Sequence, residues 1–247
     1  AALAAFTLGA SPVSALELIE TPMFEAAVAA GEMPPVAERA PQEPRIITFD
    51  GEATVAGRHG GDLRMLVGRA KDVRLFVVYG YARLVGYDRD YEIRPDILAA
   101  VEVEDGRMFT LKLRKGHRWS DGEAFTAEDF RYWWEDVANN PDLAPSGPPK
   151  EMLAGGVAPS FEVIDETTVR YTWPQRNPFF LPSLARAAPL FIFRPAHYMK
   201  RFHIEYAAAE DLEAMADQGG ERNWAAMHNR MDNMYHFDNP DLPTLQP

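Results

Sequence analysis

The sequence of 247 residues predicts an α/β protein, and three observations favour this class. Residues 109–113 alternate apolar and polar side chains, which is the period of a half-buried strand. Residues 127–138 instead place apolar side chains three and four positions apart, as an amphipathic helix does. The 20 prolines and 17 glycines indicate many turns, which a helical bundle would not need.

The most informative segment joins these two patterns and reads FTLKLRKGHRWSDGEAFTAEDFRYWW over residues 109–134. Its Asp-Gly pair at residues 121–122 marks a turn, because glycine adopts positive φ without steric cost. We expect the strand to end at residues 113–114. The hydroxyl of Thr126 should then cap a helix over residues 127–138.

The predicted helix should carry acids at its start and aromatic rings on one face. Glu128 and Asp129 place negative charge against the free N–H groups of the first turn. The apolar positions i, i+3, i+4 and i+7 should share a largely buried face, which consists of Phe130, Trp133, Trp134 and Val137.

The chain before residue 109 has weaker patterns. Residues 16–60 are rich in Pro, Glu and Ala, and we interpret them as an extended or poorly ordered arm. Residues 62–67 are predicted to form the first core strand and residues 73–86 a helix. A turn should then lead into residues 94–103.

Beyond the central helix, four prolines in residues 139–150 predict a long loop, since proline lacks the amide donor that a helix requires. Residues 161–173 are predicted to form a hairpin and residues 190–193 an apolar strand. Further helical pieces are expected at residues 196–202, 207–217 and 223–227.

Composition and charge exclude several classes of protein. A net charge of −12 argues against nucleic acid or an anionic membrane as a partner. Cysteine is absent, which excludes disulfides, thiolate catalysis and Cys-based zinc sites. Residues 1–15 are interpreted as the remnant of a secretory signal peptide, so we expect a periplasmic location. No other apolar run approaches the ~20 residues that span a bilayer.

The histidines form the one metal-like set in the sequence. Their spacing does not bring two rings to one helix face, as an i, i+4 pair would. We therefore interpret them as surface or capping residues and expect no metal and no other cofactor. The set is His197, His203, His228 and His236.

Three pairs of neighbouring carboxylates are candidates for acid–base chemistry. Each also has a structural explanation, as a helix start, a hairpin turn and the polar face of a strand. The pairs are Glu128/Asp129, Asp165/Glu166 and Glu102/Glu104. A glycosidase needs two carboxylates that converge in one cleft, which a sequence does not display. A secreted carboxylate-based hydrolase acting on oligosaccharides or peptides therefore stays open as an alternative.

The segment LRKGHRWSDGEAFTAEDFRYWWEDV resembles the strand–turn–helix hallmark of the family 5 extracellular solute-binding proteins. The resemblance rests on Leu-Arg, a Gly, an aromatic residue, Asp-Gly and then Thr-Ala-Glu-Asp before an aromatic helix. It covers residues 61–173. These proteins are the dipeptide-, oligopeptide- and nickel-binding receptors of ABC importers.

The resemblance implies a fold like that of the type II periplasmic binding proteins, in a fragment that lacks the second lobe. It implies a signal remnant at residues 1–15 and an extended arm at residues 16–60. Residues 61–83 and 179–247 would form an incomplete hinge-bearing lobe, and residues 84–178 a small α/β domain between them in the sequence. The function implied is a monomeric, non-enzymatic periplasmic receptor. It would bind peptides or similar small nutrients by hinge closure and deliver them to an ABC permease in the inner membrane.

The resemblance also implies where a ligand would touch this half. The turn at residues 69–81 and the loop at residues 139–150 should border one concavity, whereas the main ligand-anchoring acid belongs to the missing half. In the loop, the backbone carbonyls and two side-chain amides should be free to bind a ligand. The candidate ligand-binding residues are Asp72, Arg74, Tyr79, Tyr81, Asn139 and Asn140.

Overall fold

The structure is a computed structural model, and it describes residues 17–52, 54–62, 64–69, 72, 82–234 and 239–245. The predicted signal remnant and most of the predicted helix at residues 73–86 lie outside this range. The helix does not extend to residue 86, because Val85–Tyr87 forms the first strand, β1. This strand pairs antiparallel with β2, Ile93–Pro95, in a two-stranded hairpin.

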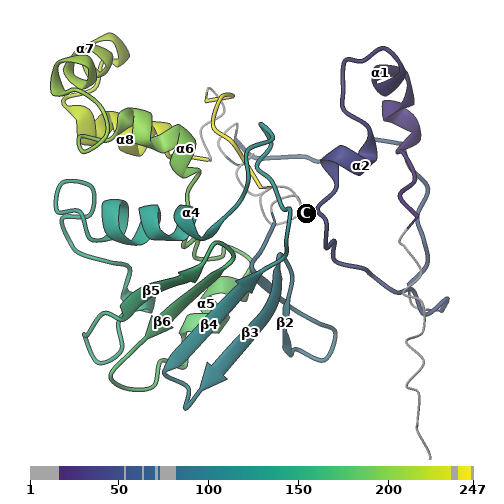
Figure 1. The fold of residues 1–247 in the computed structure, drawn as a ribbon, viewed down its shortest axis with the longest axis horizontal. Helices are drawn as coiled ribbons and strands as arrows, with labels where there is room; N and C mark the ends of the chain where they lie inside the picture. The colour runs from purple at the N-terminus through teal and green to yellow at the C-terminus, as the bar shows by residue number, and fades with distance from the viewer. Residues whose placement is uncertain are drawn as a thin grey trace, which may run out of the picture.

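The centre of the fold is a four-stranded antiparallel sheet in the order β3-β4-β6-β5 (Figure 1). Its strands are β3 (Leu98–Glu104), β4 (Met108–Leu113), β5 (Ser160–Asp165) and β6 (Thr168–Thr172). The strand predicted to end near residue 113 and the hairpin predicted at residues 161–173 are both confirmed. Together with the helices, the sheet makes a mixed α/β fold.

One face of this sheet is apolar and the other polar, as the period of two requires. On the apolar face, Phe109 pairs with Tyr171 and Leu111 with Val169. On the opposite face, the guanidinium of Arg170 donates a hydrogen bond to the hydroxyl of Thr110. The core therefore lies on one side of the sheet.

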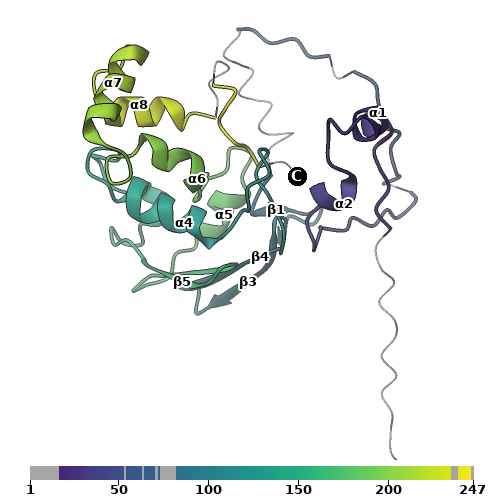
Figure 2. The ribbon, with the colours of Figure 1, turned by 45° about the horizontal axis from the view of Figure 1, so that its top comes forward.

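Helices cover the apolar face in two layers (Figure 2). The first layer consists of α4 (Ala127–Arg131), its continuation η3 (Tyr132–Ala138) and α5 (Phe180–Ala185). The second layer lies over α4 and consists of α6 (Ala196–Met199), η5 (Lys200–Phe202), α7 (Ala209–Gly219) and α8 (Trp224–Met231). The helical pieces predicted in residues 196–227 are confirmed. None of the helices in the described part of the chain is both long enough and apolar enough to cross a membrane.

The central helix starts as predicted. The Thr126 hydroxyl accepts the N–H of Glu128 at 3.3 Å, and the Asp129 carboxylate accepts the N–H of Thr126 at 2.9 Å, which completes a capping box. Phe130, Trp133 and Trp134 are buried, as the periodicity predicts.

The second half of this helix differs from the expectation, because residues 132–138 form a π-helix. A wider turn changes which side chains share a face. Tyr132 and Asp136 are also buried, on the side that faces the second helical layer. The helix therefore has two buried faces, whereas the sequence pattern indicated one.

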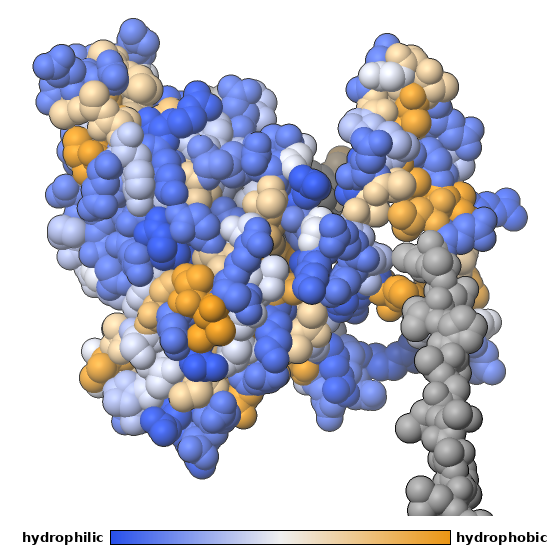
Figure 3. Space-filling view, in the orientation of Figure 1, coloured by the Kyte–Doolittle hydropathy of each residue, from blue (hydrophilic) through white to orange (hydrophobic). Residues whose placement is uncertain are grey.

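The N-terminal arm contains short helices that the sequence did not indicate, namely η1 (Pro22–Phe24), α1 (Glu25–Ala29) and α2 (Val36–Arg39). Glu20 joins them, since its carboxylate accepts the N–H groups of Thr21 and Val36 and pairs with Arg39. Figure 3 shows hydrophobic surface on this arm beside the mostly hydrophilic body. Described residues 40–60 form no helix or strand, in agreement with the predicted extended arm.

Two predicted strands are wrong. The described residues of 62–67 are not in a strand, and the side chain of Leu66 is fully exposed. A strand requires a hydrogen-bonded neighbour, and an apolar pattern alone does not provide one. Residues 190–193 form a buried loop instead, with Ile192 in the core. There, the N–H of Leu190 donates to the carbonyl of Ser183 at the end of α5.

Two hydrophobic cores result. The main core lies between the sheet, α4 and α5, and it includes Phe109, Trp173 and Phe180 in mutual ring contact. The second core lies among α6, α7 and α8 and includes Tyr132. The division into a hinge-bearing lobe and a small domain at residues 84–178 stays a prediction.

Candidate functional site

Of the predicted ligand-binding residues in the turn, only Asp72 belongs to the described part of the chain. Its carboxylate accepts the N–H of Arg69 at 3.0 Å, and its own N–H donates to the Arg69 carbonyl at 2.9 Å. Asp72 therefore closes a local turn and keeps acceptor capacity on its carboxylate. Arg74, Tyr79 and Tyr81 lie outside the described residues.

The two asparagines of the predicted loop already have partners within the chain. Asn139 donates its amide to the carbonyl of Trp134 at 2.7 Å, at the end of the π-helix. The Asn140 carbonyl oxygen accepts the N–H groups of Asp142 and Leu143. The expectation that both amides are free is therefore wrong, because short polar side chains satisfy the backbone where a helix ends. Their contact with a ligand stays a prediction.

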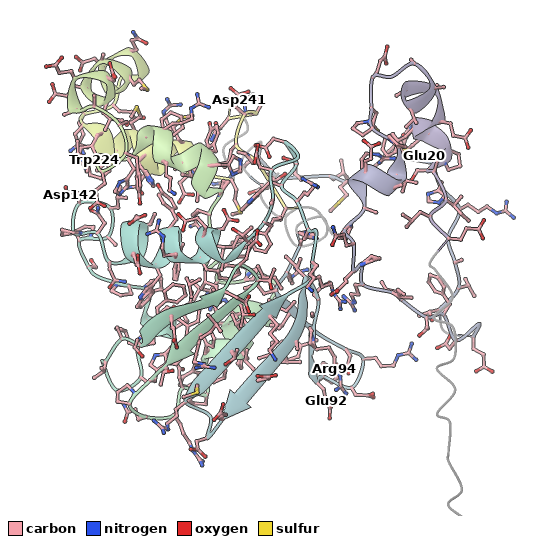
Figure 4. All side chains as sticks on the ribbon, in the orientation of Figure 1. Glu20, Glu92, Arg94, Asp142, Trp224 and Asp241 are labelled. Atoms are coloured by element: carbon pink, nitrogen blue, oxygen red, sulfur yellow. The ribbon has the colours of Figure 1, made fainter. Side chains whose placement is uncertain are left out.

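The loop lies at the end of the central helix that points away from the N-terminal arm, as the positions of Asp142 and Glu20 show (Figure 4). The concavities that described residues line include four that neither Asp72 nor the 139–150 loop lines. A shared concavity between turn and loop stays a prediction.

The largest of the four concavities measures about 990 Å³ and lies between residues 32–42 of the arm and the turn at residues 116–122. Gly116 fixes the approach of these segments, since its φ is +78° and an added Cβ would lie 2.7 Å from the Gln42 nitrogen. His117 also lines this space, and burial lowers the pKa of its imidazole. The groove is open and polar in part.

Asp129 makes more contacts than the helix start that the sequence predicted for it. Besides the Thr126 N–H, its carboxylate accepts the Trp119 indole N–H at 3.2 Å and the Ala196 N–H at 3.0 Å. Burial raises the pKa of Asp129 to about 6, while these donors favour the charged form. A buried carboxyl with a raised pKa is a feature of many catalytic sites. Here, however, its oxygens accept hydrogen bonds from the turn at residues 119–123, from the start of the central helix and from α6, and so join these three segments.

The other candidate carboxylates are engaged in structural contacts as well. Glu128 pairs with Arg131 and Lys200, and the hydrogen bonds from the Arg131 guanidinium hold the pKa of Glu128 below its ordinary value. Asp165 accepts the N–H of Thr167 in the hairpin turn, and Glu102 pairs with Lys112 across the sheet. None of the three pairs converges on a described cavity.

The histidine prediction is wrong for His228, whereas His203 caps the C-terminus of η5, as one of the two predicted roles requires, although it is not at the surface. His203 and His228 are fully buried, and their rings lie 5.7 Å apart between the central helix and α8. The His203 Nε2–H donates to the Asp136 carbonyl at 3.0 Å, and its Nδ1 accepts the N–H of Glu205. The His228 Nε2 lies 2.8 Å from the Tyr132 hydroxyl.

The contacts among His203, His228 and Tyr132 could not be predicted from residue spacing within one helix. The histidines come from two different elements and meet Tyr132 from a third, which sequence spacing cannot reveal. Burial lowers the pKa of His228 to about 3, so its ring is neutral at physiological pH. Within the described ranges, no three His, Asp or Glu side chains are grouped so that they could hold a metal ion.

Comparison with known proteins gives the family. Residues 92–226, more than half of the chain, match the family described as bacterial extracellular solute-binding proteins, family 5 Middle. The chain belongs to this family. The matched region begins just before β2 and ends in α8, so it contains the whole sheet and the turn–helix unit built around Asp129.

Two curated relatives are periplasmic binding proteins. The periplasmic alpha-galactoside-binding protein of Rhizobium meliloti (strain 1021) is 30% identical over 200 residues, which is 73% of this chain and 28% of the relative. The periplasmic murein peptide-binding protein MppA of Escherichia coli (strain K12) is 34% identical over 62 residues, which is 25% of this chain and 12% of MppA.

Solved structures of family 5 relatives share the fold. An oligopeptide-binding protein OppA superposes with a TM-score of 0.81 at 29% identity, over 94% of this chain and 35% of that one. The binding protein MelB of Agrobacterium fabrum C58, in complex with stachyose, gives 0.52 at 27% identity, over 75% and 30%. The chain thus spans about a third or less of the length of these relatives.

Proposed function

We propose that this chain is part of a periplasmic solute receptor that serves an ABC importer. Its match to family 5 over residues 92–226 carries the proposal. In this mechanism, a second lobe closes over the ligand by hinge motion, and the closed monomer docks on a permease in the inner membrane. The described part of the chain supplies a packed α/β body, which suits a closing lobe.

The carboxylates favour binding over hydrolysis. An acid–base mechanism needs two carboxyl groups that face one substrate cleft. Asp129 is occupied by three N–H donors, and Glu128 is paired with two cations. Both serve to hold the fold, so this pair does not support the hydrolase alternative.

Peptides or similar small nutrients are the proposed ligands, and α-galactoside oligosaccharides are a second candidate. The similarity to OppA and to MppA supports peptides. The alpha-galactoside-binding relative, matched over 200 residues, and MelB, solved with stachyose, support an oligosaccharide. Both ligand classes suit a cleft that binds through hydrogen bonds and bridging water.

Calorimetry on the full-length receptor decides between these ligands. Tri- to pentapeptides form one series, and raffinose and stachyose form the other. Tight stoichiometric binding of one series, without turnover, supports the receptor and names its ligand class. Release of shorter peptides or of free sugars, detected by chromatography, would instead establish the hydrolase.

A double substitution tests the proposed ligand turn. Arg74→Ala with Tyr79→Ala should weaken ligand binding, because it removes a guanidinium that can meet a carboxylate and a ring that can pack on an apolar group. We expect about a tenfold or larger rise in Kd, or roughly 1.4 kcal/mol. Unchanged affinity in calorimetry, with a normal melting curve, would make this turn merely structural.

A further inference from the structure

A smaller concavity, of about 360 Å³, lies on the apolar side of the sheet where α5 begins, and we call it the corner groove. Val103 of β3 and Phe109 of β4 are cross-strand partners, and both line it. Behind β4 and β6, α5 covers much of the same face (Figure 1). The corner groove is therefore a part of the apolar face that the helices leave open. Its other apolar walls are Ile93 of β2, Pro178, and Leu181 and Pro182 of α5.

Apolar side chains in and beside the corner groove face water. Val103 is 46% exposed, and Phe179, which follows the lining residue Pro178 in the chain, is 68% exposed. Among the described residues that line the groove, only Arg176 and Asn177 have polar side chains. A concave apolar surface with few polar groups is typical of a site for a small ligand that has an apolar part.

The wall at residues 176–179 is fixed by Asn177, which is buried. The backbone N–H of Asn177 donates to the Gly106 carbonyl at 2.9 Å, and its side-chain amide donates to the Glu151 carbonyl at 3.0 Å. Its Oδ1 accepts the N–H of Phe179 at 3.2 Å. Because these groups are already satisfied, Asn177 holds the wall and leaves Arg176 as the polar group that a ligand can bind.

Arg176 places the one charged side chain among the described lining residues of the groove. Its aliphatic stem lies against Gly106, where an added Cβ would be 3.6 Å from the Arg176 Cγ. Within the described ranges, its guanidinium has no hydrogen-bond or ion-pair partner. A planar guanidinium can bind a carboxylate through two parallel hydrogen bonds. Its charge therefore complements an anionic group attached to an apolar one.

We propose that the corner groove binds a medium-chain aliphatic carboxylate, with its chain against Val103 and Phe109 and its carboxylate on Arg176. A peptide segment is disfavoured, because its backbone N–H and C=O groups would be buried against apolar side chains without partners. An aliphatic chain has no such groups. This site is separate from any solute cleft, and the proposal does not rest on the receptor function.

Calorimetry on the full-length protein tests the ligand chemistry with octanoate, hexanoate and 1-octanol. Octanoate should bind at one site. Hexanoate should bind about tenfold more weakly, because it buries two fewer CH₂ groups at about fourfold each. The alcohol 1-octanol should bind about fivefold or more weakly than octanoate, because it lacks the charge that Arg176 recognises. Absence of octanoate binding, or equal affinity for octanoate and hexanoate, overturns the proposal.

Three substitutions locate the binding site. Arg176→Gln should lower octanoate affinity about fivefold or more and leave 1-octanol affinity unchanged. Arg201→Gln is the matched control, since Arg201 also has no described ion-pair partner and stacks on Tyr198 and Phe202 in the second helical layer. Val103→Glu puts a carboxylate into the groove at an exposed position, so it should abolish octanoate binding with little change in melting temperature.

The same variants separate this site from other occupants and from the proposed receptor function. Octanoate affinity that Arg176→Gln and Arg201→Gln change equally overturns the site. A dimer in sedimentation that Val103→Glu dissociates would assign the groove to a second copy of the chain and also overturn the proposal. Binding of peptides or oligosaccharides should be the same in all of these variants, so failure of the receptor function leaves the octanoate result intact.

Discussion

Asp129→Ala should lower the free energy of unfolding by about 2–4 kcal/mol at pH 7, because the carboxylate serves three buried or partly buried N–H donors. The substitution leaves the N–H groups of Thr126, Ala196 and the Trp119 indole without their acceptor. Relief from burying a charge offsets part of this cost. Urea unfolding monitored by tryptophan fluorescence measures the difference.

Glu104→Gln is the matched control for this substitution, because Glu104 is an exposed carboxylate at the end of β3. Its replacement should change stability by less than about 0.5 kcal/mol. An Asp129→Ala variant as stable as the control would show that the three N–H groups find other acceptors and that Asp129 does not join these elements.

The pH dependence of stability should carry the signature of Asp129. Its pKa rises from 3.8 to about 6 on folding because burial disfavours the charged form. The folded state therefore holds this proton more tightly, and the stability that the proton contributes is present below pH 3.8 and is lost as the pH rises through 6. Asp129→Asn should abolish this decline, since an amide does not titrate. Urea unfolding from pH 4 to 7 measures this decline in the unmodified protein and in Asp129→Asn. If stability falls by the same amount in both, the decline belongs to other titrating groups.

The second large effect concerns ligand affinity. Residues 16–247 alone should bind ligand on the order of a thousandfold more weakly than the full-length receptor, which corresponds to about 4 kcal/mol. One lobe leaves the polar groups of the ligand facing water and lacks the closure that excludes it. Calorimetry with the identified solute measures both proteins. Sub-micromolar binding by residues 16–247 alone would contradict the two-lobe mechanism.

The hallmark segment could be predicted from the sequence because its determinants are local. The cap at Thr126, the Asp-Gly turn and the alternation of β4 each act within a few residues, and all three are present in the fold. Burial of Phe130, Trp133 and Trp134 follows from helical spacing in the same way.

The features that the sequence missed depend on distant partners. Asp129 accepts an N–H from Ala196, 67 residues away, and His228 meets Tyr132, 96 residues away. Separations of this length do not follow the helical or strand period, so a sequence pattern cannot indicate these contacts. The strand predicted at residues 62–67 was wrong for the same reason. An apolar run forms a strand only where a second backbone can pair with it. The predicted ligand contacts likewise depend on how distant segments come together.

The central helix, with its two buried faces, has a consequence for cooperativity. Phe130 and Trp133 belong to the main core, whereas Tyr132 belongs to the second. If the α6–α8 layer detached, the Tyr132 ring and the buried Asp136 would enter water while the helix still had to hold the sheet. Local opening of that layer is therefore costly, and both layers should unfold as one unit. In the proposed receptor, a body that unfolds as one unit would move as one unit, so hinge motion would occur outside it.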